Sequence, residues 1–301
     1  MLLKHQVVLV TGAGRGIGAE IAKAAARCGA RVVVNDLGSS LAGEGTNGFA
    51  AQGIVSEIIA AGGEAIANHA DVSAADQAQA MVTEAIDRFG RLDVVVNNAG
   101  IVRDAIFHKM PYEDFDLVDS VNLRGVFYVS RAAAAQFKEQ RSGCYVHMTS
   151  TSGLVGNLGQ ANYGAAKMGV AGLSKCIALD MSKFNVASNA VAPFAWTRMV
   201  AGVQETNENR KRLESARQMT PEKIAPLIVA LASDMGRRIT GQVFGVRNNE
   251  LFLFSQPRPL RSIHNAAGWT PESIVKRAFP AFEPSLLPLE KSGDVFAWDP
   301  L

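Results

Sequence analysis

Residues 7–18 of the 301-residue chain read VVLVTGAGRGIG, a short β-branched run that leads directly into a glycine-rich turn. Apolar residues then recur at helical spacing from Ile17 to Cys28, and Gly29 is a favourable residue for ending that helix. Such a turn places backbone amides at a helix N-terminus, where the helix dipole favours an anion such as a pyrophosphate. A lone glycine-rich turn could also be an ordinary connection between a strand and a helix.

Short apolar runs alternate with longer alanine-rich segments along the chain up to about residue 250. The runs are almost continuously apolar, as expected of strands that helices cover on both faces. This alternation predicts one α/β domain with a doubly wound parallel sheet, which binds ligands at the carboxyl ends of its strands. The expected strands are Gln6 to Val10, Arg31 to Asn35, Glu64 to Ala70, Leu92 to Val96, Cys144 to Met148 and Val186 to Val191.

The composition argues against several classes of function. The formal net charge is only +2, and no basic cluster exceeds Arg210-Lys211-Arg212, so we expect no nucleic-acid partner. The chain has no run of the roughly 18 apolar residues that a membrane span needs, and its N-terminal apolar patch is too short for a secretory signal. Its three scattered cysteines suit reduced thiols. We therefore expect a cytoplasmic protein with no membrane contact and no metal site.

Around the glycine turn the spacing is T-G-x-x-x-G-x-G, in which Gly12, Gly16 and Gly18 would serve tight turning, phosphate approach and helix packing. Asp36 ends the second expected strand, where a carboxylate can accept hydrogen bonds from an adenosine ribose and repel a 2′-phosphate. This predicts NAD over NADP, although Arg15 could pair with a phosphate. The alternative role of Asp36 is to cap a turn.

Polar residues also follow the third and fourth expected strands, on the side where the cofactor would lie. Asp71 and Asn98 are candidates for contacts with adenine, ribose or backbone, but Asp71 could instead cap a helix and Asn98 could belong to a turn. The expected cofactor residues up to this point are Gly12, Arg15, Gly16, Ile17, Gly18, Asp36, Asp71, Val72, Asn98, Ala99 and Gly100.

Three residues form a candidate catalytic group. Tyr163 and Lys167 are one helical turn apart, so their side chains would lie on one helix face, and an ammonium beside a phenol lowers the phenol pKa. That suits a general acid/base at neutral pH. Ser150 ends the fifth strand and would hold and polarise a substrate oxygen. No histidine lies in these motifs, which argues against a Ser-His-Asp hydrolase.

Asn122 lies within an otherwise helical stretch. It could anchor a water molecule that relays protons to Lys167. An isolated asparagine is more often a solvated helix position, because asparagine is a mediocre helix former.

Taken together, these motifs resemble the short-chain dehydrogenase/reductase family over roughly residues 5 to 250. The resemblance implies a seven-stranded Rossmann sheet, an Asn-Ser-Tyr-Lys tetrad of Asn122, Ser150, Tyr163 and Lys167, and a homodimer or homotetramer. Tyr163 and Lys167 would also contact the cofactor. The family usually has Pro-Gly after the sixth strand, whereas this chain has Pro193-Phe194, with Thr197 as the expected hydroxyl contact to the nicotinamide amide.

A closer likeness exists in two segments, Val32 to Gly38 and Gly156 to Tyr163. They look like the (3R)-hydroxyacyl-CoA dehydrogenase unit of the peroxisomal multifunctional enzyme and like related bacterial dehydrogenases. The hydratase and sterol-carrier domains of that enzyme are not found here, so a stand-alone dehydrogenase is expected.

Two segments depart from the regular pattern. The stretch from Phe194 to Gln218 is apolar and aromatic at its start, through Trp196, Met199 and Val200, and suits a lid over an apolar substrate; it could also be an ordinary surface helix. Residues 251–301 hold seven of the eleven prolines and are expected to form an arm that packs on the domain or on a neighbouring subunit. Thr270-Pro271-Glu272 predicts a short helix to about Ala278. The cations near the expected lid, Arg210, Lys211, Arg212 and Arg217, could meet the phosphates of coenzyme A.

The sequence therefore predicts an NAD-dependent oxidoreductase that interconverts a secondary alcohol and a ketone, on a 3-hydroxyacyl-CoA or hydroxysteroid-type substrate. One alternative is a catalytically silent NAD-binding regulator or scaffold on the same fold. Another is a reductase of a different keto substrate, such as 3-oxoacyl carrier protein.

Overall fold

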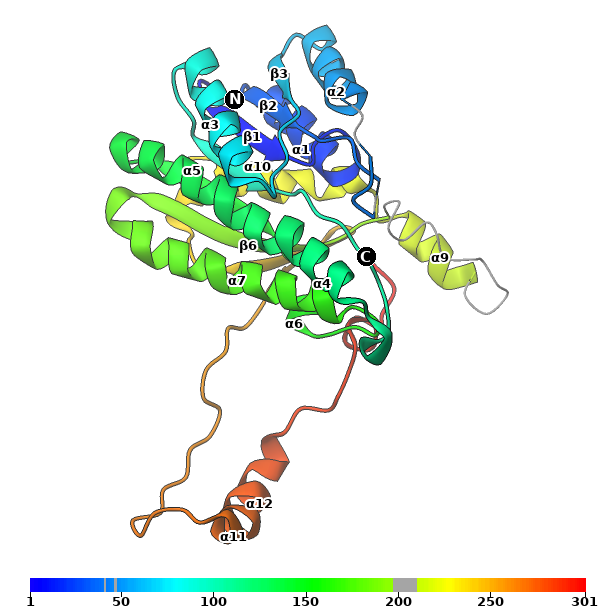
Figure 1. Cartoon of the computed structure of the whole chain (residues 1–301), viewed down its shortest axis with the longest axis vertical. Coiled ribbons are helices and arrows are strands. Elements are labelled where there is room, and N and C mark those ends of the chain that lie inside the picture. The colour runs from blue at the N-terminus through cyan, green and yellow to red at the C-terminus, as the bar shows by residue number, and fades with distance from the viewer. Residues whose placement is uncertain (41, 46–47, 197–209) are drawn as a thin grey trace.

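The computed structural model describes residues 1–40, 42–45, 48–196 and 210–301 (Figure 1). Its centre is an eight-stranded sheet in the order β3-β2-β1-β4-β5-β6-β7-β8, in which every neighbouring pair up to β7 is parallel. The doubly wound α/β fold is thus confirmed. The strands are β1 (Val7–Thr11), β2 (Arg31–Asn35), β3 (Glu64–Asn68), β4 (Val94–Asn97), β5 (Gly143–Met148), β6 (Val186–Phe194), β7 (Val243–Arg247) and β8 (Glu250–Leu253).

The eighth strand is a difference from the seven-stranded parallel sheet that we expected. Asn248 has a positive φ of 56°, and with Asn249 it reverses the chain, so that β8 pairs antiparallel with β7. A two-residue asparagine turn of this kind matches the twist of a hairpin. The ion pair of Arg247 with Glu250, at 3.3 Å, lies across the turn.

Helices cover both faces of the sheet. Those of the main body are α1 (Gly16–Arg27), α2 (Phe49–Ala60), α3 (Ala75–Phe89), α4 (Tyr112–Asp119), α5 (Gly125–Gln140), α6 (Thr151–Leu154), α7 (Ala161–Met181), α9 (Arg210–Arg217) and α10 (Ala225–Ala232). A π-helical turn, η2 (Ser120–Arg124), joins α4 to α5. Single 3₁₀ turns cover Phe107–Lys109, Ser182–Phe184, Pro221–Lys223 and Gly236–Arg238. No helix among the described residues is long and apolar enough to cross a membrane.

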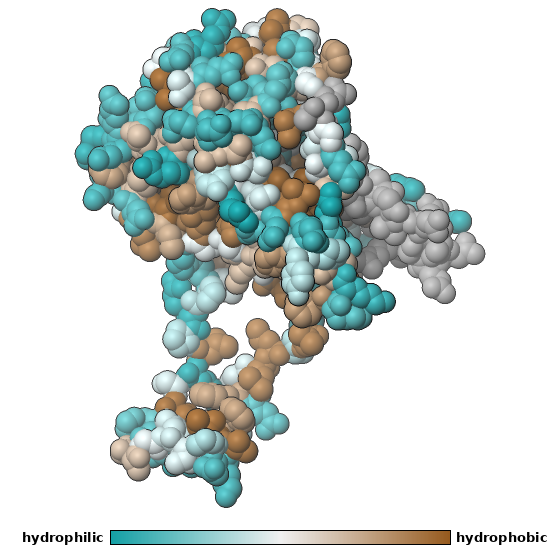
Figure 2. All heavy atoms as spheres, in the orientation of Figure 1, coloured by the Kyte–Doolittle hydropathy of each residue, from teal (hydrophilic) through white to brown (hydrophobic). Residues whose placement is uncertain are grey.

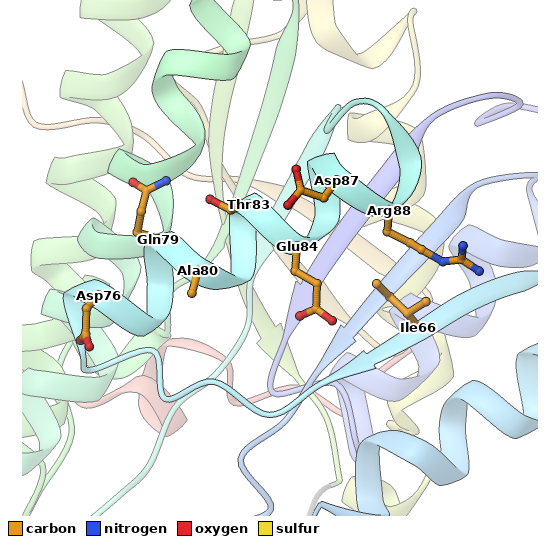
Figure 3. Close-up of a pocket in the computed structure, with 8 residues that line it drawn as sticks. All are labelled: Ile66, Asp76, Gln79, Ala80, Thr83, Glu84, Asp87 and Arg88. Atoms are coloured by element: carbon orange, nitrogen blue, oxygen red, sulfur yellow. The ribbon is translucent and has the colours of Figure 1, made fainter.

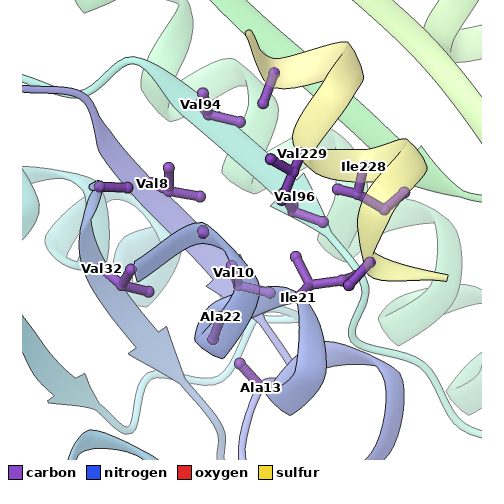
Figure 4. Close-up of a cluster of buried hydrophobic side chains, with 14 of the residues drawn as sticks. Val8, Val10, Ala13, Ile21, Ala22, Val32, Val94, Val96, Ile228 and Val229 are labelled. Carbon is purple, nitrogen blue, oxygen red and sulfur yellow. The ribbon is translucent and has the colours of Figure 1, made fainter. Parts of the chain in front are cut away.

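The valine runs supply two separate cores because successive side chains of a strand point to opposite faces. Val8 and Val10 of β1 pack in one cluster with residues of α1, α2 and α10, and Figure 4 shows Val10 beside Ile21 of α1. Leu9, between those two valines, belongs to the core on the other face, which α3 and α5 cover. Because helices cover both faces of the sheet, a ligand is expected at the carboxyl ends of the strands.

After β8 the chain leaves the body, carries a short helical segment and returns to the sheet (Figure 1). The helical segment consists of α11 (Pro271–Ser273), the π turn η6 (Ile274–Ala278) and α12 (Phe279–Phe282), followed by a 3₁₀ turn at Glu283–Ser285 and then by α13 (Ser292–Val295). Its predicted start is confirmed, because the Thr270 hydroxyl caps it by accepting from the Ser273 amide at 3.2 Å. It continues past the predicted end at Ala278, through Phe282.

The part of this extension that projects from the body, residues 257–290, is called the arm below. Figure 2 shows apolar side chains gathered on it. Exposed apolar residues of the arm include Leu260, Val275, Phe279, Leu286, Leu287 and Leu289.

Candidate active site

The glycine turn between β1 and α1 has the geometry that its spacing predicts. Gly12 and Gly16 have positive φ angles of 62° and 54°, a conformation that L side chains rarely adopt. A Cβ at Gly18 would lie 2.3 Å from the Gly12 carbonyl oxygen, so only glycine lets α1 approach the turn this closely. A Cβ at Gly16, by contrast, would have no heavy atom within 4 Å. The turn therefore packs tightly at Gly18 and leaves free space at Gly16.

This open end of α1 fits a dinucleotide pyrophosphate. The first amides of a helix have no partners within the helix, and they carry its positive dipole end. The first turn of α1 contains no acidic residue, and the exposed Arg15 at its N-cap makes no capping hydrogen bond with its side chain. The space in front of Gly16 is the space that a phosphate would need to reach these amides.

The carboxylate of Asp36 lies against the same turn. Its two oxygens accept hydrogen bonds of 2.7 Å from the Gly14 and Gly38 amides, which is the turn-capping role named as the alternative. A Cβ at Gly14 would lie 2.8 Å from one of these oxygens. Each carboxylate oxygen can accept more than one hydrogen bond, so the capping role leaves capacity for a ribose.

Asn98 and Thr11 join the end of β4 to the glycine turn. The Asn98 side-chain amide donates to the carbonyls of Thr11 and Gly12, at 3.0 and 2.9 Å. The Thr11 hydroxyl accepts from the amides of Asn98 and Ala99, at 3.0 and 3.1 Å. The Asn98 side chain thus holds the turn in place. Thr11 is the threonine of the T-G-x-x-x-G-x-G spacing, but no role of its own was predicted for it. Its place at the end of β1, next to the end of β4, is the signal that could have indicated one.

Asp71 and Val72 have local roles in the structure. The Asp71 carboxylate accepts from the amide and the hydroxyl of Ser73, at 2.8 and 2.7 Å, in the turn before α3. The Val72 side chain is buried in the core, where a Cβ at Gly125 would lie 2.9 Å from its methyl carbon. In this structure the Asp71 side chain therefore has the alternative role, in which it caps the turn before α3.

Asn122 is fully buried, so its interpretation as a solvated helix position is wrong. It belongs to η2, and π-helical turns of this kind frequently occur at functional sites. Its side-chain oxygen accepts from the Ile101 amide at 3.1 Å, and its side-chain nitrogen donates to the Ile101 carbonyl at 2.8 Å. A Cβ at Gly100 would lie 2.5 Å from the Asn122 oxygen and 3.5 Å from the Lys167 ammonium nitrogen. Asn122 thus fixes the loop after β4 beside Lys167.

Ser150, Tyr163 and Lys167 come together at the carboxyl end of β5. Ser150 is the N-cap of α6, and its hydroxyl accepts from the Ser152 amide at 3.1 Å. The same hydroxyl is near enough to the Tyr163 phenol to act on its pKa. The Lys167 ammonium is 5.6 Å from the centre of the Tyr163 ring and donates to the Met148 carbonyl at 2.9 Å. The structure therefore brings together the three side chains that the sequence grouped.

The expected lowering of the Tyr163 pKa is wrong for this structure. Burial raises the pKa of Tyr163 to about 12, although the hydrogen bond with Ser150 acts in the lowering direction. Burial also lowers the pKa of Lys167 to about 8. The physical reason is that taking both groups out of water disfavours their charged forms, and the Lys167 ammonium is directed at Met148 rather than at the phenol oxygen.

The start of α7 is held by the loop that follows β4, through residues that sequence reasoning missed. The buried Asn162 donates to the Arg103 carbonyl at 2.9 Å, and Gln160 donates to the Asp104 carboxylate at 3.0 Å. A β-bridge also joins Ala105 to Gln160. These contacts fix the position of the first turn of α7, which carries Tyr163. The signal that could have indicated Asn162 is its position directly before Tyr163.

The end of β6 faces the same edge of the sheet. Pro193 and Phe194 are its last residues, and the Trp196 amide donates to the Met219 carbonyl at 2.6 Å. Thr197, Met199 and Val200 lie outside the described residues, as do the side chains of Lys211 and Arg212. Among the expected lid residues, α9 carries exposed Arg210 and Arg217, and the Arg217 guanidinium lies 5.6 Å from the centre of the Trp196 ring.

A surface hollow of about 810 Å³ lies along α3, and its lining residues come from β3 and α3 (Figure 3). None of its lining residues belongs to the group around Tyr163 or to the glycine turn, so this hollow is not the candidate active site. Its lining residues are Ile66, Asp76, Gln79, Ala80, Thr83, Glu84, Asp87 and Arg88. In the described part of the chain, no group of three metal-ligating side chains is found.

Comparisons with known proteins show what this chain is similar to. A family model described as enoyl-(acyl carrier protein) reductase matches residues 12–247. The chain is 44% identical over 232 residues to a short-chain type dehydrogenase/reductase of Mycobacterium tuberculosis, covering 77% of this chain and 79% of that protein. It is 44% identical over 246 residues to a 3-oxoacyl-[acyl-carrier-protein] reductase of Synechocystis, covering 81% and 96%. With the peroxisomal hydratase-dehydrogenase-epimerase of Saccharomyces cerevisiae it shares 40% identity over 276 residues, covering 91% of this chain but only 30% of that protein.

Two solved structures are similar in fold and sequence. A short-chain dehydrogenase from Mycobacterium avium superposes with a TM-score of 0.83 at 38% identity, covering 96% of this chain and 98% of that one. A 7α-hydroxysteroid dehydrogenase in complex with NADH and 7-oxo glycochenodeoxycholic acid has a TM-score of 0.74 at 30% identity, covering 82% and 94%.

Proposed function

The chain belongs to the short-chain dehydrogenase/reductase family, and from this premise we propose that it is an NAD-dependent oxidoreductase that interconverts a secondary alcohol and a ketone. The observation that carries the proposal is the grouping of Ser150, Tyr163 and Lys167 at the carboxyl end of β5. This group stands at the sheet edge where the glycine turn can hold a dinucleotide. A hydroxyl donor and a phenol at one position can bind and protonate a single oxygen atom.

In ketone reduction, Tyr163 donates its phenolic proton to the substrate oxygen while Ser150 holds that oxygen in place. When bound, the nicotinamide cofactor supplies or accepts the hydride at the substrate carbon. A raised pKa keeps Tyr163 protonated at neutral pH, so the phenol is poised as an acid. In alcohol oxidation the phenolate form of Tyr163 takes the proton instead, and the nearby Lys167 ammonium stabilises that phenolate before the transfer. Asn122 fixes the loop beside Lys167 through Ile101.

The proposed preference for NAD rests on Asp36. Its carboxylate lies beside Gly14 at the end of β2, where the ribose of a dinucleotide held by the glycine turn would lie. There it would accept from ribose hydroxyls and repel a 2′-phosphate. The comparison structure with bound NADH supports a nicotinamide cofactor without deciding between the two forms.

For the substrate we propose a 3-hydroxyacyl-CoA or a hydroxysteroid-like alcohol. The resemblance to the dehydrogenase-containing peroxisomal enzymes supports the first, and the neighbour with a bound bile acid supports the second. A 3-oxoacyl carrier protein is the rival substrate, because the Synechocystis relative is named as its reductase. A silent NAD-binding scaffold has less support, since Ser150, Tyr163 and Lys167 are all present and assembled.

We further propose that the chain works in the cytoplasm as a homodimer or homotetramer, in which the arm packs on a neighbouring subunit. Cys28, Cys144 and Cys176 are all free thiols, which suits a reducing compartment. Exposed apolar side chains on a projecting arm are typical of an association surface. No nucleic acid or membrane has a part in this proposal.

The function is tested with purified protein, NAD and a panel of 3-hydroxyacyl-CoA esters, hydroxysteroids and simple secondary alcohols, followed by NADH absorbance. Tyr163→Phe should lose at least a hundredfold in kcat while NAD affinity changes little, because general acid/base catalysis contributes about 10² to 10⁴ in rate. Tyr112→Phe, at a fully exposed tyrosine on α4, is the matched control. Full activity in Tyr163→Phe would refute the assigned role.

A further inference from the structure

We infer that residues 291–301, here called the C-terminal strap, form one wall of the substrate pocket and that Phe296 limits the size of the apolar group next to the reacting carbon. This rests on the proposed alcohol-ketone chemistry. The group that it would meet is the acyl chain or ring carried by the substrate. Four observations support it.

First, the strap is hydrogen-bonded to the segment that carries Ser150. The Ser292 hydroxyl donates to the Thr151 hydroxyl at 2.6 Å, and the Ser292 amide donates to the Gly156 carbonyl at 2.9 Å. Thr151 is buried and directly follows Ser150, so these contacts reach one residue from the candidate catalytic hydroxyl. Ser292 is therefore a positioning residue for the start of α6.

Second, the strap packs on the end of β6. The Phe296 ring lies 4.8 Å, centre to centre, from the Phe194 ring in an edge-on arrangement, and Phe194 follows Pro193 at the strand's carboxyl end. Phe252 and Phe254 complete the cluster, at 5.4 and 6.1 Å from Phe296. Aromatic pairs in this geometry are favourable beyond the area that they bury.

Third, the strap has an anchor of its own on the sheet. The buried Arg247 guanidinium donates to the carbonyls of Phe296 and Trp298 and lies 5.1 Å from the centre of the Trp298 ring. The Trp298 indole donates to Glu250 at 2.8 Å, and the Asn248 side chain donates to the Leu301 carbonyl at 2.7 Å. This anchor involves no residue of the arm, so the strap is held to the body directly.

Fourth, the contacts with Thr151 and with Phe194 show where the strap lies relative to the reacting atoms. β5 and β6 are neighbours in the sheet; Ser150 follows β5 and Phe194 ends β6. A segment that touches both Thr151 and Phe194 must therefore cross the carboxyl ends of the two strands, where ligands bind in sheets of this kind. Phe296 makes the second of these contacts and is half-buried, so its ring is the apolar surface that the strap offers at this edge.

The experiment measures kcat/KM for wild type and Phe296→Ala on a homologous series of substrates of increasing chain length or ring bulk. We expect the ratio of long to short substrates to rise at least tenfold in Phe296→Ala, because one methylene group in an apolar pocket is worth about 10- to 200-fold in discrimination. Phe279→Ala, at an exposed phenylalanine of the arm, is the matched control and should leave the ratio unchanged.

Phe296→Leu and Phe296→Trp guard against a folding defect. If Phe296→Ala does not fold, Phe296→Leu should still raise the ratio and Phe296→Trp should lower it. A purely structural residue would change the melting temperature without changing the ratio.

The positioning role of Ser292 has its own test. Ser292→Ala should raise KM more than it lowers kcat, and Ser292→Thr, which keeps the hydroxyl, should return KM to the wild-type value. Ser262→Ala in the arm serves as control. An unchanged length profile in folded Phe296 variants with active wild type would overturn this inference alone. Wild type without turnover on every substrate would instead overturn the proposed function.

Discussion

The Lys167 ammonium nitrogen lies 5.6 Å from the centre of the Tyr163 ring, and its hydrogen bond goes to the Met148 carbonyl at the end of β5. The two side chains are thus neighbours without a direct bond between ammonium and phenol oxygen. Because both groups are buried, Tyr163 is pushed toward the phenol, which can donate a proton, and Lys167 is pushed toward the neutral amine. This arrangement determines how the site should respond to pH.

The phenol of Tyr163 should remain protonated through neutral pH in the protein without cofactor. Its pKa is raised to about 12, whereas an ordinary tyrosine ionises near pH 10. The difference in tyrosinate absorbance between wild type and Tyr163→Phe should therefore stay near zero until the pH passes about 10 and then grow toward pH 12. A tyrosinate signal that is lost on mutation near neutral pH would contradict this expectation.

Lys167→Met should increase the free energy of unfolding, relative to wild type, more at pH 7 than at alkaline pH. Burial lowers the pKa of folded Lys167 to about 8 from an unfolded value of 10.5, so its contribution to stability is present above pH 10.5 and is lost as the pH falls through 8. One pKa unit corresponds to about 1.4 kcal/mol, so the advantage of Met over Lys should be about 3 kcal/mol larger at pH 7 than above pH 10.5. Denaturant unfolding at both pH values measures it. A stability difference that does not change with pH would show that Lys167 is not desolvated.

Asp36→Ala should shift the cofactor preference toward NADP. Removing the carboxylate eliminates its repulsion of a 2′-phosphate, and a pair of charges about 4 Å apart near a protein surface is worth on the order of 1 to 4 kcal/mol. The ratio of kcat/KM with NADP to that with NAD should rise at least tenfold. The variant also loses the capping bonds to Gly14 and Gly38, so affinity for both cofactors should fall. An unchanged ratio would assign Asp36 to the turn alone.

Two glycine-to-alanine variants should have opposite effects. Gly18→Ala would bring a methyl group to 2.3 Å from the Gly12 carbonyl oxygen, so it should destabilise the fold and abolish nucleotide binding. Gly172→Ala adds the same methyl group in α7, where no atom outside the neighbouring backbone of that helix lies within 4 Å, and should stabilise the protein by about 1 kcal/mol. Thermal unfolding and calorimetric titration of NAD measure both effects. Equal stability of the two variants would mean that the turn is looser than its geometry indicates.

Changing Leu286, Leu287 and Leu289 to Ser should reduce the mass of the assembly. These exposed side chains lie on the arm, away from the groups around Tyr163, and the change removes apolar surface that a neighbouring subunit would cover. Light scattering after size-exclusion chromatography should show a dimer or tetramer for wild type and a smaller species for the triple variant. A monomeric wild type would refute the expected association.

Much of the fold and part of the site could be predicted because they depend on neighbours in the sequence. The valine runs and the alanine-rich segments between them indicate strands and helices through periodicity alone. The positive φ angles of Gly12 and Gly16 follow from backbone sterics that any strand-to-helix turn of this spacing must satisfy. Tyr163 and Lys167 share a helix face for the same local reason.

The remaining features depend on which distant segments pack together. Asn122 is buried because a π turn directs it toward Ile101, and no local pattern distinguishes it from a solvated asparagine. The pKa of Tyr163 follows from desolvation by its surroundings, which overrides the charge one helical turn away. The contact of Ser292 with Thr151 joins residues 141 positions apart. Periodicity and sterics are properties of adjacent residues, whereas burial and long-range contacts exist only once the chain has folded.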